Sequence, residues 1–191
     1  MTANRYFAFA LTLAAGCAPA YAPSPAEASR DELAIYTVVI DSVLETAGDP
    51  FVVMAESTAV VGLSEQELAR WSPGRDSTFP TAAFADLVVR NRTPVRVPTR
   101  TLTDREIRTF RPADFHPEFV PDASGNYVLR GFEPVRRLHI LSRPGVDAER
   151  RRAVIFAGSG CGGLCGVLQL VQLTRAKRGW GVVKVDTVMQ S

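Results

Sequence analysis

The chain has 191 residues, a formal net charge of +2 at pH 7 and a hydrophobic share of 46%. A chain this close to neutral lacks the strong positive field that nucleic-acid binding requires, so we expect no nucleic-acid partner. The part of the chain that follows Ser29 is long enough for one domain with a hydrophobic core of its own.

The segment from Met1 to Cys17 has the layout of a bacterial export signal. Arg5 precedes a short apolar run over 6–16, which ends at Cys17. The run is too short to cross a bilayer as a helix, which takes about 20 residues. Its ending, Leu13-Ala-Ala-Gly-Cys17, resembles the lipobox of bacterial lipoproteins. The resemblance implies cleavage before Cys17, acylation of that cysteine and anchoring in a membrane of the cell envelope, on its periplasmic or surface side.

A second processing route stays open. The lipobox usually carries Leu three positions before the cysteine, whereas this chain has Ala14 there. Ala18-Pro-Ala20 and Ala26-Glu-Ala28 also fit an Ala-x-Ala site of ordinary signal cleavage, which would discard Cys17. On the lipoprotein interpretation, the chain divides into a signal peptide over 1–16, a lipidated tether rich in Ala and Pro over 17–29, and one domain over 30–191.

Helical signals follow the tether. Ser29-Arg-Asp-Glu32 is a capping box, and apolar residues at helical spacing predict a helix over 30–47 that Gly48 ends. A short apolar run over 51–55 predicts a buried strand. Two further helices are expected, one from the capping box at Ser64–Glu67 to Trp71 and one over 82–90.

The middle of the chain is rich in proline. Thr103-Asp-Arg-Glu106 is a third capping box, which favours a helical start before Ile107. Five prolines between Thr93 and Pro121 predict irregular chain wrapped on the surface, because proline cannot join a central strand.

From Asn126 the pattern changes to strands. Runs over 138–141, 153–157, 167–174 and 180–188 predict a meander of three or four antiparallel strands. Helices first and strands last predict an α+β fold, with N-terminal helices packed on a C-terminal curved antiparallel sheet of three to four strands. This order of elements is similar to the cystatin/NTF2-like architecture, an analogy of fold alone.

The last third of the chain also resembles an uncharacterised group of bacterial exported proteins. The residues that carry the resemblance are Leu141-Ser142, Ala153-Val-Ile-Phe156, Cys161-Gly-Gly-Leu-Cys165-Gly166 and Gly179-Trp180. In that group a strand, a Cys/Gly-rich turn and a second strand precede a tryptophan strand. The resemblance implies a sheet here and carries no activity, cofactor or catalytic residue.

Cys161 and Cys165 are the pair left for a disulfide once Cys17 is acylated in an oxidising compartment. In a fully extended chain their Cα atoms would be about 13 Å apart, whereas a disulfide needs about 5.5 Å. The glycines between them let the chain fold back, so a disulfide in a tight loop is expected. Free thiols and a redox pair are the alternatives, and the spacing C-x-x-x-C disfavours the second.

A glycine pattern in the same region invites a nucleotide-binding interpretation. Gly158-Ser-Gly-Cys-Gly-Gly163 satisfies G-x-G-x-x-G, the dinucleotide-binding pattern. It begins so near the last residue, Ser191, that little chain is left for a parallel sheet. A glycine-rich connection between strands is therefore expected, and no cofactor.

The two histidines are the remaining candidates for chemistry. Asp114, His116 and Glu118 alternate along the chain, and His139 could complete a metal site with them. The alternative is a solvent-facing loop. No nucleophile elbow accompanies either histidine, so neither a metal site nor a catalytic residue is assigned.

Arginines cluster at Arg136-Arg137 and at Arg150-Arg151-Arg152. These clusters predict solvated chain, and the alternative is a patch that touches anionic lipid or cell-wall polymer. Trp71, Phe132 and Trp180 are expected to pack in the core or at an edge.

Together these patterns predict an envelope lipoprotein with a non-catalytic binding or structural role toward an unknown envelope ligand or protein. The alternative is an exported enzyme, either a thiol-redox protein that uses Cys161 and Cys165 or a metal-dependent hydrolase that uses His116 and His139.

Overall fold

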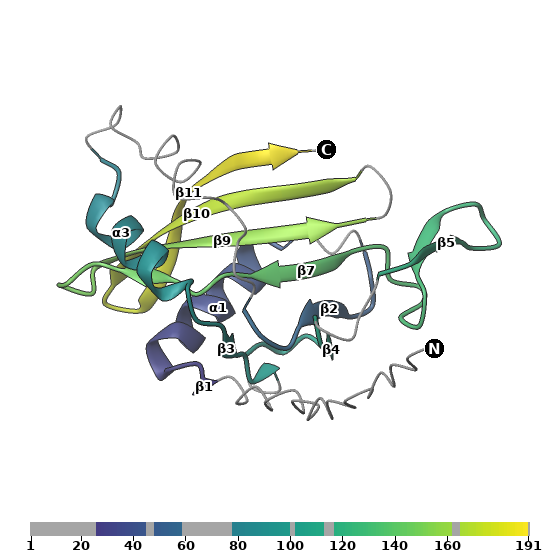
Figure 1. Ribbon diagram of the computed structural model, residues 1–191, viewed down its shortest axis with the longest axis horizontal. Coiled ribbons are helices and arrows are strands. Elements are labelled where there is room, and N and C mark those ends of the chain that lie inside the picture. Colours follow the sequence, from purple (N-terminus) through teal and green to yellow (C-terminus); the bar gives the residue numbers. More distant parts are fainter. Residues whose placement is uncertain are drawn as a thin grey trace, which may run out of the picture.

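A seven-stranded mixed sheet forms the centre of the molecule (Figure 1). The computed structural model describes residues 26–44, 48–58, 78–99, 102–112, 117–161 and 165–190. In the sheet the strands run in the order β11-β10-β9-β7-β2-β4, with β8 pairing to β9 as well. Their bounds are β2 Val52–Ala55, β4 Ile107–Phe110, β7 Leu138–Leu141, β8 Gly145–Val146, β9 Arg152–Gly160, β10 Gly166–Ala176 and β11 Gly179–Gln190.

Two short pairs of strands and two helices complete the described structure. In the first pair β1 (Ala26–Glu27) runs parallel to β3 (Val95–Arg96), and in the second β5 (Phe119–Pro121) runs antiparallel to β6 (Tyr127–Leu129). The helices are α1 (Arg30–Ser42) and α3 (Thr81–Arg90). No helix within these described ranges is long and apolar enough to cross a membrane.

The predicted α+β fold, with N-terminal helices on a small antiparallel sheet, is wrong. The antiparallel strands β7, β9, β10 and β11 are present. However, β2 and β4 extend their sheet, with β2 lying parallel to both β7 and β4. Strands rather than helices dominate the described chain, so the cystatin/NTF2-like analogy, which rested on the expected arrangement, is wrong too.

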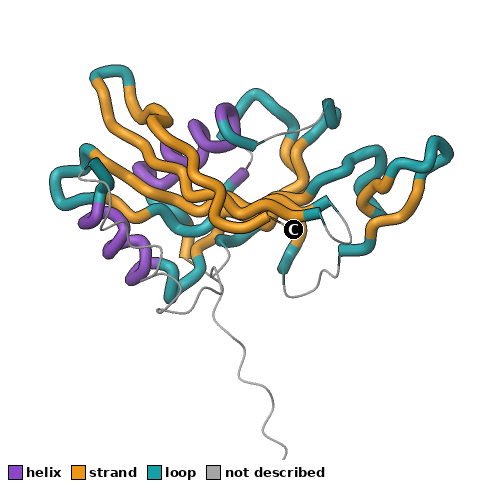
Figure 2. The backbone as a smooth tube through the Cα atoms, turned by 90° about the horizontal axis from the view of Figure 1, so that it is seen from above, coloured by secondary structure: helices purple, strands orange, loops and turns teal. Residues whose placement is uncertain are grey.

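The two helices lie on opposite faces of the sheet (Figure 2). Side chains alternate along a strand, so β9 supplies both faces. Its Ile155 belongs to the core beneath α1, whereas Phe156 belongs to the core beneath α3 with Phe84 and Leu87. A third, smaller core beside β6 is built from Phe51, Val53, Leu129 and Val135.

The local helix and strand signals outside the middle of the chain are largely confirmed. Helix α1 begins at the predicted capping box, in which Ser29 Oγ accepts from the Glu32 amide and a Glu32 carboxylate oxygen accepts from the Ser29 amide. It ends at Ser42, earlier than predicted. Helix α3 and strand β2 match their predicted spans within one residue. The helix predicted from Ser64 to Trp71 lies outside the described residues.

The third capping box does not start a helix. Thr103 Oγ1 donates to Asp41 at 2.6 Å and accepts from the Arg105 amide at 3.3 Å, while the Glu106 carboxylate pairs with Arg108. The residues that follow form β4, which pairs along its whole length with the buried strand β2. Pairing with a distant strand thus overrides the local helix signal.

The prediction of irregular chain over 93–121 is also wrong in part. Strands β3, β4 and β5 all fall in this range. They avoid the prolines, except for Pro121 at the end of β5 in a separate two-stranded piece. A proline is tolerated there because the strand belongs to no central ladder.

Candidate functional site

Two hairpin turns and the start of α1 lie together at one end of the sheet, at the left of Figure 1. The Arg175 amide on β10 donates to the Arg151 carbonyl at 2.8 Å. On α1, Asp31 pairs with Arg150 at 2.9 Å and with Arg175 at 4.0 Å. We call the cationic side chains gathered here the basic end, which consists of Arg150, Arg151, Arg152, Arg175, Lys177 and Arg178.

The charge of the chain is concentrated at the basic end. Its six cations are accompanied by the carboxylates of Asp31, Asp147 and Glu149, which gives a formal charge of 6 − 3 = +3. The whole chain carries +2, so the remainder of the molecule is at +2 − 3 = −1. The molecule is therefore electrically asymmetric although its net charge is small.

Two of the three carboxylates at the basic end, Asp147 and Glu149, are engaged within the β8–β9 turn. Asp147 Oδ1 accepts from the backbone amides of Arg151 at 2.7 Å and of Arg152 at 3.1 Å, and Glu149 pairs with Arg151. In contrast, Lys177 and Arg178 are exposed and form no ion pair within the described chain. The excess positive charge is thus presented to solvent.

A cavity of about 520 Å³ opens at the basic end. Its walls are the first turn of α3, the β8–β9 turn and strand β10. Arg151, Arg152 and Arg175 line it, together with the carboxylates of Asp147 and Glu149. A second hollow of about 330 Å³ shares Pro80, Arg152 and Thr174 with the first. The first cavity is large enough for a small ligand or a headgroup.

The first turn of α3 adds to the positive potential of this cavity. Among the residues that the structure describes, no side chain caps the helix at its N-cap residue, Pro80. Uncapped amides at a helix start carry a partial positive charge. Together with the three guanidinium groups, which outnumber the two carboxylates in the lining, they give the cavity an excess of positive charge that favours an anion.

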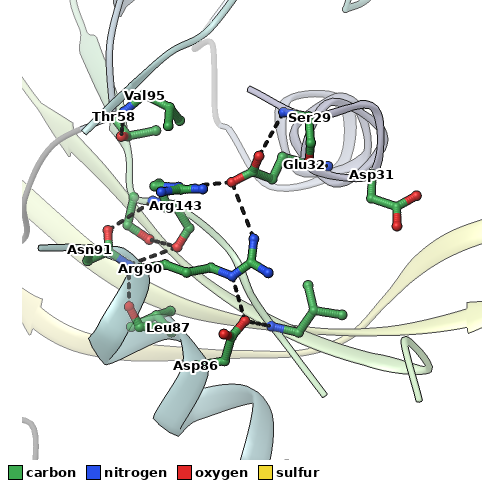
Figure 3. Close-up of polar contacts among 12 residues, drawn as sticks. Ser29, Asp31, Glu32, Thr58, Asp86, Leu87, Arg90, Asn91, Val95 and Arg143 are labelled. Atoms are coloured by element: carbon green, nitrogen blue, oxygen red, sulfur yellow. Dashed lines mark hydrogen bonds and ion pairs between the residues drawn. The ribbon is translucent and has the colours of Figure 1, made fainter. Parts of the chain in front are cut away.

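A buried polar network holds the two helices in place behind the basic end (Figure 3). Glu32, 2% exposed, accepts from Arg143 Nε at 2.9 Å and lies 3.6 Å from Arg90 Nη1. Arg90 in turn pairs with Asp86 at 2.7 Å. Asn91, which follows the same helix, exchanges two hydrogen bonds with the Arg143 backbone. The network joins α1, the last turn of α3 and the β7–β8 connection.

The environment of Glu32 keeps its carboxyl group ionised, which preserves its ion pairs with Arg143 and Arg90. Burial alone would raise the pKa of its carboxyl, but the hydrogen bonds from Ser29 and Arg143 outweigh burial and hold that pKa below its ordinary value. The neighbouring phenol of Tyr36 is fully buried, and burial together with the charge of Glu32 raises its pKa. Its hydroxyl has no hydrogen-bond partner among the described residues.

The structure describes two of the four residues weighed as a metal site, Glu118 and His139. Asp114 and His116 lie outside the described residues, and Glu118 pairs with Arg130 at 3.2 Å. His139 is buried on β7, and its Nδ1 has no partner among the described residues. Across the described ranges no three acidic, histidine or cysteine side chains are placed to hold a metal ion.

His139 makes the stability of the fold depend on pH. Burial, together with the charge of Arg137, lowers its pKa to about 4. Between about pH 6.5 and pH 4, His139 is therefore protonated in the unfolded chain and neutral in the folded chain. The free energy of unfolding falls as the pH falls through this range. This histidine should cost about 2 kcal/mol of unfolding free energy between pH 7 and pH 5.

The measurement is denaturant unfolding of the wild type and of His139→Gln at both pH values. The variant should lose about 2 kcal/mol less than the wild type on acidification. An equal loss in both proteins would assign the acid sensitivity to other groups.

The two cysteines meet at the end of the β9–β10 hairpin opposite the basic end. Their Cα atoms are 5.2 Å apart in a disulfide, and the Cys161 amide donates to the Cys165 carbonyl at 2.9 Å. The expected glycine-rich connection is shorter than predicted, because Gly158 and Gly160 belong to β9 itself. Since β9 and β10 are antiparallel, the stretch cannot form the parallel unit of a dinucleotide site.

The aromatic predictions can be checked at two positions. Trp180 is 9% exposed in the core beneath α1, with Arg175 stacked 5.8 Å from its ring centroid. Phe132 packs against the smaller core beside β6. Packing is thus confirmed for both residues, and Trp71 lies outside the described residues.

Sequence reasoning found part of the basic end and missed the rest. It singled out Arg150, Arg151 and Arg152, while the second cluster, at Arg136 and Arg137, lies before β7 and does not join them. It did not single out Arg175-Ala-Lys-Arg-Gly179, which forms the turn between the strands predicted over 167–174 and 180–188. The three basic residues in that turn were the available signal.

Comparisons of the chain with protein families, with curated proteins and with solved structures find no match.

Proposed function

We propose that this chain is an exported lipoprotein of the bacterial cell envelope, anchored through Cys17, whose domain has a non-catalytic role and binds an anionic partner at the basic end. The export and anchoring part is supported by the apolar run over 6–16 and by its lipobox-like ending at Cys17. The binding part is supported by one observation above all. Three arginines, which outnumber the carboxylates of Asp147 and Glu149, line one cavity together with the first turn of α3.

The groups at the basic end are suited to recognition. Guanidinium groups offer paired donors that match the oxygens of phosphate and carboxylate groups. They attract and orient an anion without exchanging protons with it near neutral pH, because arginine stays protonated. The cavity therefore provides affinity for negative charge, and binding is the role that its chemistry favours.

The anchor is tested by phase partition of the protein expressed in a bacterial host with its own signal. The wild type should enter the detergent phase of a detergent–water separation, and Cys17→Ser should stay in the aqueous phase. The matched control is the double variant Cys161→Ser/Cys165→Ser, which removes thiols elsewhere and should partition like the wild type. A wild type that stays in the aqueous phase would contradict the anchor.

A further inference from the structure

We propose that the basic end docks on the phosphate headgroups of anionic lipids in the membrane that holds the anchor. The inference rests on the proposed function and names the partner of the same site. It assigns the basic end a second contact with the membrane, which would orient the domain on that surface.

The first support is the position of the basic end relative to the start of the domain. Asp31 in the first turn of α1 pairs with Arg150 and Arg175, so the cations lie beside the point where the folded chain begins. Ala26, the first described residue, follows closely after Cys17 in the chain. The segment between them spans at most about 30 Å even when fully extended. An anchored domain would thus keep the basic end near the headgroups at a high effective concentration.

The second support is the exposure of the cations. The side chains of Arg150 and Arg151 are 70% and 71% exposed, and that of Arg175 is 45% exposed. Lys177 and Arg178 form the tip of the neighbouring hairpin. Basic residues at a membrane surface are attracted to anionic lipid over about one Debye length, which requires such an exposed arrangement.

The third support is the cavity between the first turn of α3, the β8–β9 turn and strand β10. Any negative surface would attract exposed cations, whereas a phosphate group entering the cavity would meet Arg151, Arg152 and Arg175 together. The Asp147 and Glu149 carboxylates that also line the cavity are already hydrogen-bonded to the Arg151 and Arg152 amides and to the Arg151 side chain. Charge-assisted hydrogen bonds from several guanidinium groups would then hold a headgroup in place. The chain that begins at Cys17 lacks Arg5 and carries +1, so its part outside the basic end is at +1 − 3 = −2 and would be turned away from the anionic surface.

The test uses the mature chain with Cys17→Ser, which cannot be acylated, so that docking is measured without the anchor. Co-sedimentation with vesicles of phosphatidylglycerol and phosphatidylcholine in equal parts is compared with pure phosphatidylcholine vesicles at low ionic strength. Binding is expected on the anionic vesicles alone, and it should weaken steeply as salt is added.

The decisive variant is Lys177→Gln/Arg178→Gln, which removes two exposed charges that carry no ion pair in the described chain. Its partition constant on anionic vesicles should fall by about 10- to 30-fold. The matched control is Arg130→Gln/Arg136→Gln, which removes the same charge near β5 and β7, away from the basic end, and should keep wild-type binding (Figure 1).

Three results would overturn the proposal. The first is equal binding to neutral and anionic vesicles, and the second is an equal loss in the two double variants. The third is sedimentation with purified cell-wall polymer but not with anionic vesicles, which would make the polymer the partner. A failed anchor would appear in the phase partition of the wild type and would leave vesicle binding intact, so the two failures are distinguishable.

Discussion

Replacing Glu32 by Gln is expected to lower the free energy of unfolding by about 3 kcal/mol at pH 7. The substitution keeps the shape of the side chain and removes its charge. The carboxylate is 2% exposed and is the partner of Arg143, whose side chain is only 20% exposed. Removing one member of such a pair leaves an uncompensated charge that water reaches poorly, and this residual charge accounts for most of the loss.

Chemical denaturation of the two proteins measures the effect, and the chain offers a close control at the preceding position. Asp31→Asn removes the same charge from the same helical turn, but Asp31 is 37% exposed and pairs with the exposed Arg150. This variant should change stability by less than about 1 kcal/mol. Similar losses of unfolding free energy in the two variants would show that the loss comes from removing a charge in the first helical turn, and that the buried pair with Arg143 contributes little.

Replacing Gly145 by Ala is expected to destabilise the protein by about 3 kcal/mol or more. Strand β8 lies directly against α3, and a Cβ at Gly145 would overlap the carbonyl oxygen of Ala83 and the amide nitrogen of Leu87. Both are backbone atoms, so no side chain can rotate out of the way. Relief requires β8 and α3 to separate, which also loosens the packing of Phe84 and Leu87 on the sheet.

Thermal or denaturant unfolding of Gly145→Ala should be compared with that of Gly181→Ala. A Cβ at Gly181, on β11, meets no atom within 4 Å, so this control should change stability by less than about 1 kcal/mol. Wild-type stability in Gly145→Ala would contradict the close approach of β8 to α3. Since the first turn of α3 lines the cavity, that result would also remove one of the walls assigned to the site.

Local signals predicted the elements whose causes are local. The capping box at Ser29 and Glu32 specifies the start of α1 through two hydrogen bonds within a single helical turn, and the structure contains both. The short apolar run of β2 is buried along its whole length. Such features can be found from sequence because the interacting groups are neighbours in the chain.

The fold class could not be predicted in this way, because it depends on pairing between distant strands. Nothing in the local pattern of Ile107–Phe110 indicates that it will lie parallel to β2, and the preceding capping box pointed to a helix. The polar network around Glu32 could not be predicted from the sequence either. Its partner Arg143 lies 111 positions away and is brought there only when β7 enters the sheet.

The basic end could be predicted from the sequence only in part. The sequence shows a run of three arginines over 150–152. Their proximity to Arg175 depends on the register of β9 and β10, which places Arg152 opposite Thr174. Ion pairs from both turns to Asp31 then place this cluster beside the start of α1. The sequence therefore supplies the charges, and the register of the sheet assembles them.

The most direct test of the account is the intact mass of the protein extracted from the membranes of a bacterial host that carries it with its own signal. The lipoprotein proposal predicts a chain that begins at Cys17 and carries the added mass of a diacylglyceryl group or of three acyl chains. A chain that begins after Ala20 or Ala28 without lipid would contradict it, and the anchored docking of the basic end would have to be abandoned with it.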